Sequence, residues 1–343
     1  MFEQRWLAAF VEVLGRCDVR AGDACAVLAE TQSRPLLVQL ASLALQQLGA
    51  RSFVVTVPSP AAGAVPVRST GASTALAGQQ AALHSLARCA VIVDCSVEGL
   101  QHAAELPTLL AGGARVLVIS NEHPEILLRC LPRAEDEALV REAMRRLKAA
   151  KRMNVFSRAG TDLQIDLAGA RIGGVWGFTT KPGTLTHWPG GLALAFPAAG
   201  CVNGTLVLDR GDVNLTFKRY LADAVRLPIE DDHVSDVIGD SPDAQLMRGY
   251  FAAWGDRAAY AVSHVGWGLN QRARWDAMAF YDKADFNGTE LRAFAGNFLY
   301  STGANEVAGR HTPGHFDLPL RHCSVMLDGV IVVDSGVLQG DLA

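Results

Sequence analysis

Three features are scarce in this sequence of 343 residues: an excess of positive charge, long apolar runs and paired cysteines. Lysine and arginine number 31 against 35 aspartates and glutamates, so nothing favours binding to a nucleic acid. No apolar run is long enough for a transmembrane helix, and we therefore expect no membrane partner. Residues 1–18 are hydrophobic, but Glu3 and Glu12 interrupt them and no small-residue cleavage site follows. This stretch predicts an amphipathic helix and not a signal peptide.

The seven cysteines are odd in number and scattered, and none forms a C-x-x-C pair. Several of them lie in apolar runs with the character of strands. Neither a disulfide framework nor a zinc knuckle fits this pattern. It indicates reduced, buried thiols, as in a cytoplasmic protein.

The length favours two domains. Over residues 1–150, apolar strand-like runs alternate with segments of helical length. The predicted strands are 24–31, 51–57, 89–95 and 114–120, and the predicted helices include 35–49 and 135–152. Such alternation predicts an α/β domain with a mostly parallel sheet. No glycine-rich phosphate-binding motif follows the first strand, so no nucleotide site is expected there. The stretch 58–74, rich in glycine, proline and serine, predicts a loop.

Beyond residue 150 the chain becomes rich in glycine and in short strand patterns. Two hairpins are predicted, one turning at Ala159-Gly160 and one at Arg210-Gly211. A helix is predicted over 241–254. Residues 151–343 are therefore expected to form a β-rich α+β domain.

The segment HTPGHFDLPLRH, residues 311–322, holds three of the nine histidines. His315 and Asp317 are two residues apart, so an extended strand would present both on one face. His264, in AYAVSHVGWGLN, is a candidate for a third ligand. Two histidines and one carboxylate form the facial set of non-haem Fe(II) oxygenases, with further positions open.

This pattern has ordinary explanations as well. An H-x-D pair is common, and a histidine beside Gly and Trp is often simply packed in a core. His311 and His322 compete for the same role, although each is better placed on a loop or the surface. The residues alone therefore leave the metal site as one of two interpretations.

Four stretches of the C-terminal half resemble the thermophilic, two-metal leucyl aminopeptidases: HVGWGLN (264–270), GNFLYSTG (296–303), HFD (315–317) and MLDGVIVVDSG (326–336). That family carries a Glu where this chain has His264, and a His where this chain has Leu299. The H-x-D pair is kept. One carboxylate fewer and one imidazole more favour a mononuclear site over a dinuclear hydrolytic one.

With these departures, nearly the whole chain is similar to one branch of the superfamily, the 2,5-dihydroxypyridine 5,6-dioxygenases of nicotinic acid breakdown. The resemblance implies a single Fe(II) held by His264, His315 and Asp317. It implies ring opening of 2,5-dihydroxypyridine by O₂ to N-formylmaleamic acid. Its partners would be that small molecule and O₂, in a homo-oligomer with glycine-rich β segments as a possible interface.

Ring opening also requires a base and groups that fix the ring. His187, in KPGTLTHWPGG, is the first candidate for the base, and a surface loop histidine is the alternative. His102 follows the strand CAVIVDC, at the edge where α/β sheets bind ligands, and is a second candidate. Arg292 could anchor the ring, unless it is a solvated helix charge, and Ser301 could donate a hydrogen bond to it.

Three functional classes stay open. Beside the dioxygenase stand a Zn²⁺ or Co²⁺ aminopeptidase and a non-catalytic metal-bound scaffold. Glu230 matches a metal-bridging Glu of the aminopeptidases, so a role for it would imply two metals. His264 in place of that family's Glu is the feature that separates the first two classes. The ring substituents are not fixed by sequence, because pocket residues come from distant parts of the chain.

Overall fold

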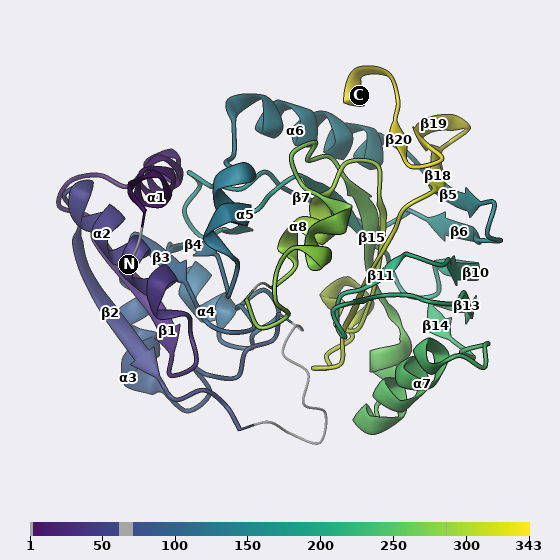
Figure 1. The fold of residues 1–343 in the computed structure, drawn as a ribbon, viewed down its shortest axis with the longest axis horizontal. Helices are drawn as coiled ribbons and strands as arrows, with labels where there is room; N and C mark the ends of the chain where they lie inside the picture. The colour runs from purple at the N-terminus through teal and green to yellow at the C-terminus, as the bar shows by residue number, and fades with distance from the viewer. Residues whose placement is uncertain (1–2, 62–70, 286) are drawn as a thin grey trace.

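A computed structural model describes residues 3–61, 71–285 and 287–343 (Figure 1). Its first half is an α/β layer built on a five-stranded parallel sheet of order β2-β1-β3-β4-β8. The strands are β1 (Ala24–Glu30), β2 (Arg51–Val57), β3 (Val91–Asp94), β4 (Arg115–Val118) and β8 (Leu185–His187). The four strands predicted in the first half are confirmed. Their continuous burial, except on the edge strand β2, explains why they are apolar at nearly every position.

Helices cover both faces of this sheet. Successive residues of β1 pack on opposite sides: Val27 contacts the cluster containing α1, α2 and α5, and Leu28 the cluster containing α3 and α4. These helices are α1 (Gln4–Arg16), α2 (Pro35–Gln47), α3 (Gln80–Leu86), α4 (Leu106–Ala111) and α5 (Pro124–Arg129). The predicted amphipathic helix at the N-terminus is thus confirmed as α1. Residues 62–70 of the predicted loop lie outside the described residues.

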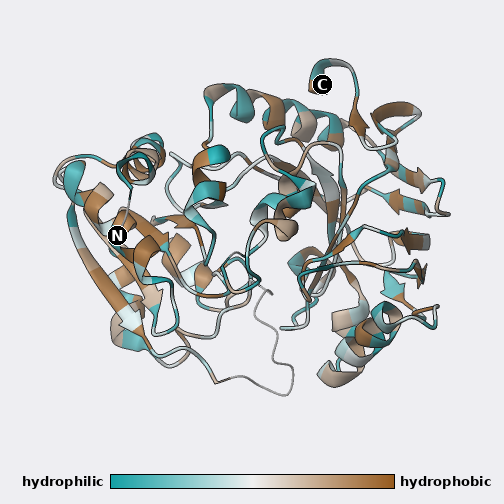
Figure 2. Ribbon diagram, in the orientation of Figure 1, coloured by the Kyte–Doolittle hydropathy of each residue, from teal (hydrophilic) through white to brown (hydrophobic). Residues whose placement is uncertain are grey.

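The second half holds an eight-stranded and a five-stranded sheet, both antiparallel, which share one core with α6 and α7. Their orders are β14-β13-β10-β6-β5-β18-β19-β20 and β17-β16-β15-β9-β7. Figure 2 shows apolar residues along strands of both halves of the molecule. The strands are β5 (Arg152–Ser157), β6 (Asp162–Asp166), β7 (Arg171–Val175), β9 (Leu192–Phe196), β10 (Val202–Leu208), β13 (Val225–Glu230), β14 (His233–Val234), β15 (Val262–Gly268), β16 (Phe298–Thr302), β17 (Phe316–Leu320), β18 (Cys323–Leu327), β19 (Val330–Asp334) and β20 (Val337–Leu338).

The remaining elements are α6 (Ala134–Ala149), α7 (Pro242–Trp254), α8 (Thr289–Ala293), the pair β11 (Val213–Asn214) and β12 (Arg219–Tyr220), and the 3₁₀ turns Arg257–Tyr260, Trp275–Ala279, Glu306–Ala308 and Gly340–Leu342. The predicted helix over 241–254 is confirmed as α7, with Ser241 as its N-cap. The mixed α/β class predicted for the chain is confirmed. No helix among the described residues is long and apolar enough to cross a membrane.

One predicted hairpin is confirmed and the other is wrong. β5 and β6 pair across Ala159-Gly160. At Arg210-Gly211 the chain does turn, but β10 pairs with β6 and β13, whereas β11 pairs with β12. The Asp212 carboxylate accepts hydrogen bonds from the Asp209 and Arg321 amides, which leads the chain out of the large sheet.

The domain boundary near residue 150 stays a prediction. The two halves are not completely separate along the chain. Strand β8 lies after residue 150 in the sequence, and yet it pairs with β4 and extends the first sheet. The second half therefore contributes a strand to the first, and β8 ends at His187, at the carboxyl edge of the parallel sheet. This edge faces the five-stranded antiparallel sheet and forms one wall of the site.

Candidate metal and substrate site

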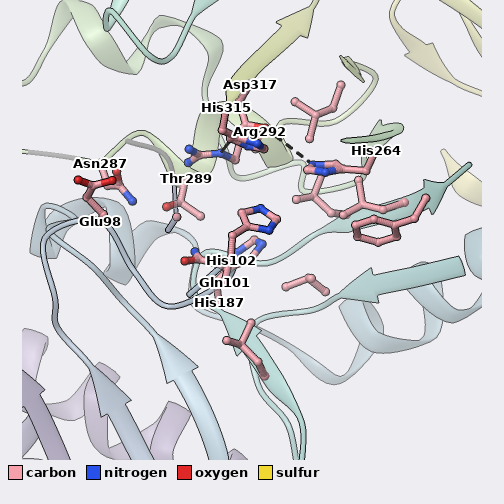
Figure 3. A pocket seen from close by; sticks show the side chains of 17 residues that line it. Glu98, Gln101, His102, His187, His264, Asn287, Thr289, Arg292, His315 and Asp317 are labelled. Atoms are coloured by element: carbon pink, nitrogen blue, oxygen red, sulfur yellow. Dashed lines mark hydrogen bonds and ion pairs between the residues drawn. The ribbon is translucent and has the colours of Figure 1, made fainter. Parts of the chain in front are cut away.

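Strand register gathers the predicted ligands. On the five-stranded sheet, His264 of β15 lies opposite Ser301 of β16, which lies opposite Asp317 of β17. His315 directly precedes β17. Three segments that are far apart in the sequence therefore place these side chains on neighbouring strands, within one pocket (Figure 3).

The donor atoms converge on one carboxylate oxygen. His315 Nε2 lies 3.2 Å and His264 Nε2 lies 3.8 Å from Asp317 Oδ1. Two ligands at right angles around an ion, each about 2.1 Å from it, lie about 3 Å apart. Both imidazoles and the carboxylate are nearly fully buried. The chemistry of this donor set, and the 3.2 Å separation of His315 from Asp317, fit one metal ion.

The three groups contact one another without already being spread around an ion. Among the described residues, no three His, Cys, Asp or Glu side chains stand in the full arrangement of a metal site. His315 Nε2 is within hydrogen-bonding distance of Asp317 Oδ1 in this state, whereas the buried His315 Nδ1 has no hydrogen-bond partner among the described residues.

The tautomer of His264 is fixed by its neighbour. The Ser263 hydroxyl donates its hydrogen to the Ala304 carbonyl at 2.5 Å. Its oxygen, 3.1 Å from His264 Nδ1, therefore accepts a hydrogen bond from that nitrogen. The proton of the neutral ring resides on Nδ1, and Nε2 presents its lone pair to the site, as a metal ligand requires.

Asp317 is held ionised by its surroundings. Burial alone would raise the pKa of this carboxyl, but Arg292, His315 and His264 together hold the pKa well below its usual range. Ser301 donates to Asp317 Oδ1 at 2.5 Å, and Arg292 Nε donates to Oδ2. Both predicted ring-binding residues thus contact Asp317. Arg292 also lines the pocket, whereas Ser301 is not among the lining residues.

His102 reaches the same cluster from the first half of the chain. It follows β3 at the carboxyl edge of the parallel sheet, where the buried Asp94 carboxylate accepts the Ser96 and Leu100 amides and holds the loop. Its ring centroid is 4.9 Å from that of His315 and 6.4 Å from that of His264. Burial, and then the nearby imidazoles, lower the pKa of His102 well below its ordinary value.

His187 lies at the end of β8 and also lines the pocket. Its Nδ1 is 2.7 Å from the Pro189 carbonyl oxygen, which can only accept, so Nδ1 carries the proton and Nε2 has a lone pair. Burial lowers the pKa of His187 to about 4, despite the bond to Pro189. The ring is therefore neutral at neutral pH, with Nε2 unprotonated.

The pocket is a cavity of about 170 Å³. An engineered protein cavity of about 150 Å³ accommodates one benzene molecule, so this space suits a single aromatic ring. Much of its wall is apolar and comes from β7, β8, β9 and β16: Val175, Leu185, Leu192, Leu194, Phe196 and Leu299. An apolar wall of this kind keeps water from a bound ring.

Sequence reasoning missed several polar residues that line this cavity: Glu98, Gln101, Asn287 and Thr289. Only Asn287-Gly288 carried a signal, and that signal is for a turn, not for a site. Glu230 lies elsewhere, exposed at the end of β13, where it lines a separate surface depression with His233 and Asp256. His311 and His322 do not line the cavity either.

Comparisons with known proteins identify the family of this chain. The sequence profile of the 2,5-dihydroxypyridine 5,6-dioxygenase family matches residues 5–340. A 2,5-dihydroxypyridine 5,6-dioxygenase of Pseudomonas putida KT2440 is 37% identical over 332 residues, which are 95% of this chain and 94% of that protein. The solved structure of 2,5-dihydroxypyridine dioxygenase from Pseudomonas putida KT2440 superposes with a TM-score of 0.92 at 35% identity, covering 98% of each chain.

A more distant structure shares the fold. Wild-type AmpT from Thermus thermophilus superposes with a TM-score of 0.66 at 13% identity, covering 99% of this chain and 100% of that one. At this identity the likeness concerns the fold alone. The profile match and the close relative, each spanning nearly the whole chain, decide the family. This chain belongs to the 2,5-dihydroxypyridine 5,6-dioxygenase family.

Proposed function

We propose that this chain is an Fe(II)-dependent dioxygenase that opens the ring of 2,5-dihydroxypyridine with O₂ to give N-formylmaleamic acid. Membership of the family supports the reaction class. The observation that carries the proposal is the convergence of His264 Nε2, His315 Nε2 and Asp317 Oδ1 beside a ring-sized cavity. Two imidazoles and one carboxylate, with other positions open, are the ligand set of non-haem Fe(II) oxygenases.

Fe(II) on these three residues would supply the electron transfer that O₂ activation needs, which redox-inert Zn²⁺ does not. The protein's own task is to hold the ring and to move protons. Asp317 stays ionised because Arg292 and Ser301 donate to its two oxygens. The apolar residues of β9 and β16 exclude water from the ring.

His187 is the proposed base. Because Nδ1 donates to Pro189, its Nε2 lone pair is the only ring position that can take the proton of a substrate hydroxyl. His102 is the second candidate, since it packs against both candidate ligand imidazoles. Arg292 keeps its terminal N–H groups for a ring oxygen, while its Nε is bound to Asp317.

We extend the proposal to the cellular setting. Cysteines 17, 25, 89, 95, 130 and 323 are unpaired and buried, which supports a reducing compartment and therefore the cytoplasm. A homo-oligomer remains part of the proposal on the strength of the resemblance alone. Size-exclusion chromatography with light scattering tests it directly.

An aminopeptidase is the second candidate, because of the resemblance to that family. Two observations count against it. Leu299 stands in the cavity where that family carries a histidine ligand, and Glu230 lies away from the site. A cavity suited to one ring also leaves little room for a peptide.

The test is reconstitution of metal-free protein. Under nitrogen, the protein is loaded with Fe(II), Zn²⁺ or Co²⁺, and oxygen uptake is then followed with 2,5-dihydroxypyridine, catechol and 1,4-dihydroxybenzene. We expect uptake with Fe(II) and 2,5-dihydroxypyridine, one O₂ per ring, and none with Zn²⁺. Hydrolysis of a leucine anilide by the Zn²⁺ or Co²⁺ form, without oxygen uptake by the Fe(II) form, would establish the aminopeptidase instead.

A further inference from the structure

One end of the pocket holds two buried polar side chains that have no hydrogen-bond partner among the residues that the structure describes. Asn287 is 3% and Thr289 is 4% exposed, and both line the cavity. No hydrogen bond joins either side chain to another residue that the structure describes, and neither carries a completely enclosed polar atom, so the carboxamide and the hydroxyl reach the cavity. Buried amides and hydroxyls in native proteins are nearly always hydrogen-bonded. A carboxamide and a hydroxyl left open toward a cavity therefore indicate a polar ligand.

The backbone that carries these side chains is firmly placed. The Thr289 amide donates to Glu122 Oε1 at 2.5 Å. Next to it, both oxygens of the buried Glu290 accept from Arg129 Nη2 at 2.7 Å. Glu122 and Arg129 belong to the first half of the chain, so α8 is fixed against the parallel sheet. Thr289 is consequently presented by a fixed segment, and Asn287 lies two residues before it in the chain.

Their place in the pocket is defined by α8 as well. Arg292, three residues beyond Thr289 on α8, donates to Asp317. Figure 3 shows Thr289 between Arg292 and Asn287, with His264 on the far side of the pocket. A ring bound beside Asp317 would thus direct one edge toward Thr289 and Asn287. Its faces would lie against the apolar wall that includes Leu194 and Leu299.

We propose that Asn287 and Thr289 form the subsite that recognises the ring nitrogen and the adjacent 2-oxygen of a hydroxypyridine in its lactam form. This inference rests on the proposed function and specifies which edge of the substrate ring the protein recognises by hydrogen bonds. A lactam offers an N–H donor beside a C=O acceptor. The Asn287 carboxamide offers the complementary acceptor and donor, so two parallel hydrogen bonds form.

The same edge of a carbocyclic ring has no such pair. With 1,4-dihydroxybenzene in the pocket, the Asn287 amide would remain buried without a partner, which costs far more than a merely absent contact. A site built to hydrogen-bond one ligand rejects analogues that lack the group. Asn287 and Thr289 would in this way select heterocyclic over carbocyclic dihydroxy rings.

The experiment measures binding, so that it does not depend on turnover. Iron-loaded protein under nitrogen is titrated calorimetrically with 2,5-dihydroxypyridine and with 1,4-dihydroxybenzene. Asn287→Leu keeps the size and removes both hydrogen bonds, and Thr289→Val removes only the hydroxyl. We expect Asn287→Leu to weaken the pyridine about 10–100-fold and Thr289→Val about 3–10-fold, with the benzene diol changed less than about 3-fold. Asn203→Leu, on the exposed face of β10, is the matched control and should change neither Kd.

The inference is overturned if Asn287→Leu leaves the pyridine Kd unchanged, or weakens both rings equally. If Asn287→Leu does not fold, as judged by its melting curve, Asn287→Ser replaces it, with the same selective loss expected. Failure of the proposed function has a different signature. Wild-type iron-loaded protein would then not bind or oxidise 2,5-dihydroxypyridine at all, before any variant is compared.

Discussion

The two ends of the pocket differ in how their polar groups are satisfied. At the Asp317 end, both carboxylate oxygens accept hydrogen bonds, and the His264 tautomer is set by Ser263. At the Asn287 end, two buried polar side chains have no partner among the described residues. Under the proposed function, the first end would hold the metal ion in fixed geometry, and the second would bind the edge of the substrate ring.

The largest effect is expected from removing Asp317, the carboxylate at the first end of the pocket. Asp317→Ala should abolish iron binding and oxygen uptake, because His264 and His315 converge on its Oδ1 and no other described carboxylate lines that side of the pocket. Iron per chain by atomic emission, together with the far-UV circular dichroism, measures the loss and the integrity of the fold.

Glu230→Ala is the matched control, because Glu230 lies exposed on β13 in a separate depression. It should keep about one iron per chain, as a mononuclear site predicts. Two metals in the wild type, with one lost in Glu230→Ala, would contradict both the control and the mononuclear site.

The next largest effect is expected at His187. His187→Gln should keep its iron and lose turnover per iron by about 10²–10⁴-fold, the usual contribution of a general acid or base. Oxygen uptake divided by bound iron measures this directly. His84→Gln, at an exposed position of α3, serves as the control.

A structural role for His187 predicts a different result. Removing the bond to the Pro189 carbonyl would then lower the melting temperature and leave turnover per iron nearly unchanged. That outcome would leave His102 as the remaining candidate for the base.

More residues of the Asp317 end than of the Asn287 end could be predicted from the sequence, for a physical reason. The H-x-D pair follows from the two-residue period of one strand, so His315 and Asp317 could be joined from sequence alone. His264 was a candidate from its own segment, and the family resemblance gave it the role of third ligand, since the strand register between β15 and β17 cannot be predicted from the sequence. Asn287 and Thr289 were missed because a polar residue attracts attention only when it is seen to be buried without a hydrogen-bond partner. Neither its burial nor its lack of a partner can be predicted from the sequence.

The wrong hairpin has the same origin. The turn at Arg210-Gly211 is real, but the path of the chain after it is set by Asp212, whose carboxylate accepts a hydrogen bond from the Arg321 amide, 109 residues away in the turn between β17 and β18. The residues of the turn determine that the chain bends there. Hydrogen bonds to residues far away in the sequence determine which strand the following segment pairs with. The parallel sheet was predictable because its strands are buried on both faces and read as apolar runs.

A smaller effect is expected from Ser263. Ser263→Ala removes the acceptor that fixes the proton on His264 Nδ1, while all three proposed ligands remain. Losses of this kind typically weaken metal affinity about 10–100-fold. Competition for iron against a chelator of known affinity measures the change, and Ser85→Ala on the exposed face of α3 is the control. An unchanged affinity for iron would mean that His264 Nε2 can bind the metal without the hydrogen bond from Nδ1 to Ser263.

The smallest expected effect is on stability against pH. The pKa of His187 is lowered to about 4 in the folded chain, whereas an unfolded histidine titrates near its ordinary 6.5. Below pH 6.5 the unfolded chain binds a proton that the folded chain does not, so the contribution of His187 is intact above pH 6.5 and is lost as pH falls toward 4. At pH 5 the loss is about 2 kcal/mol, a shift of a few degrees in melting temperature. His187→Gln cannot be protonated there, so the gap in melting temperature between wild type and variant should narrow from pH 7.5 to pH 5. Parallel melting curves over this range would mean that His187 is solvated enough to titrate normally, and that the end of β8 is more open to water than its burial indicates.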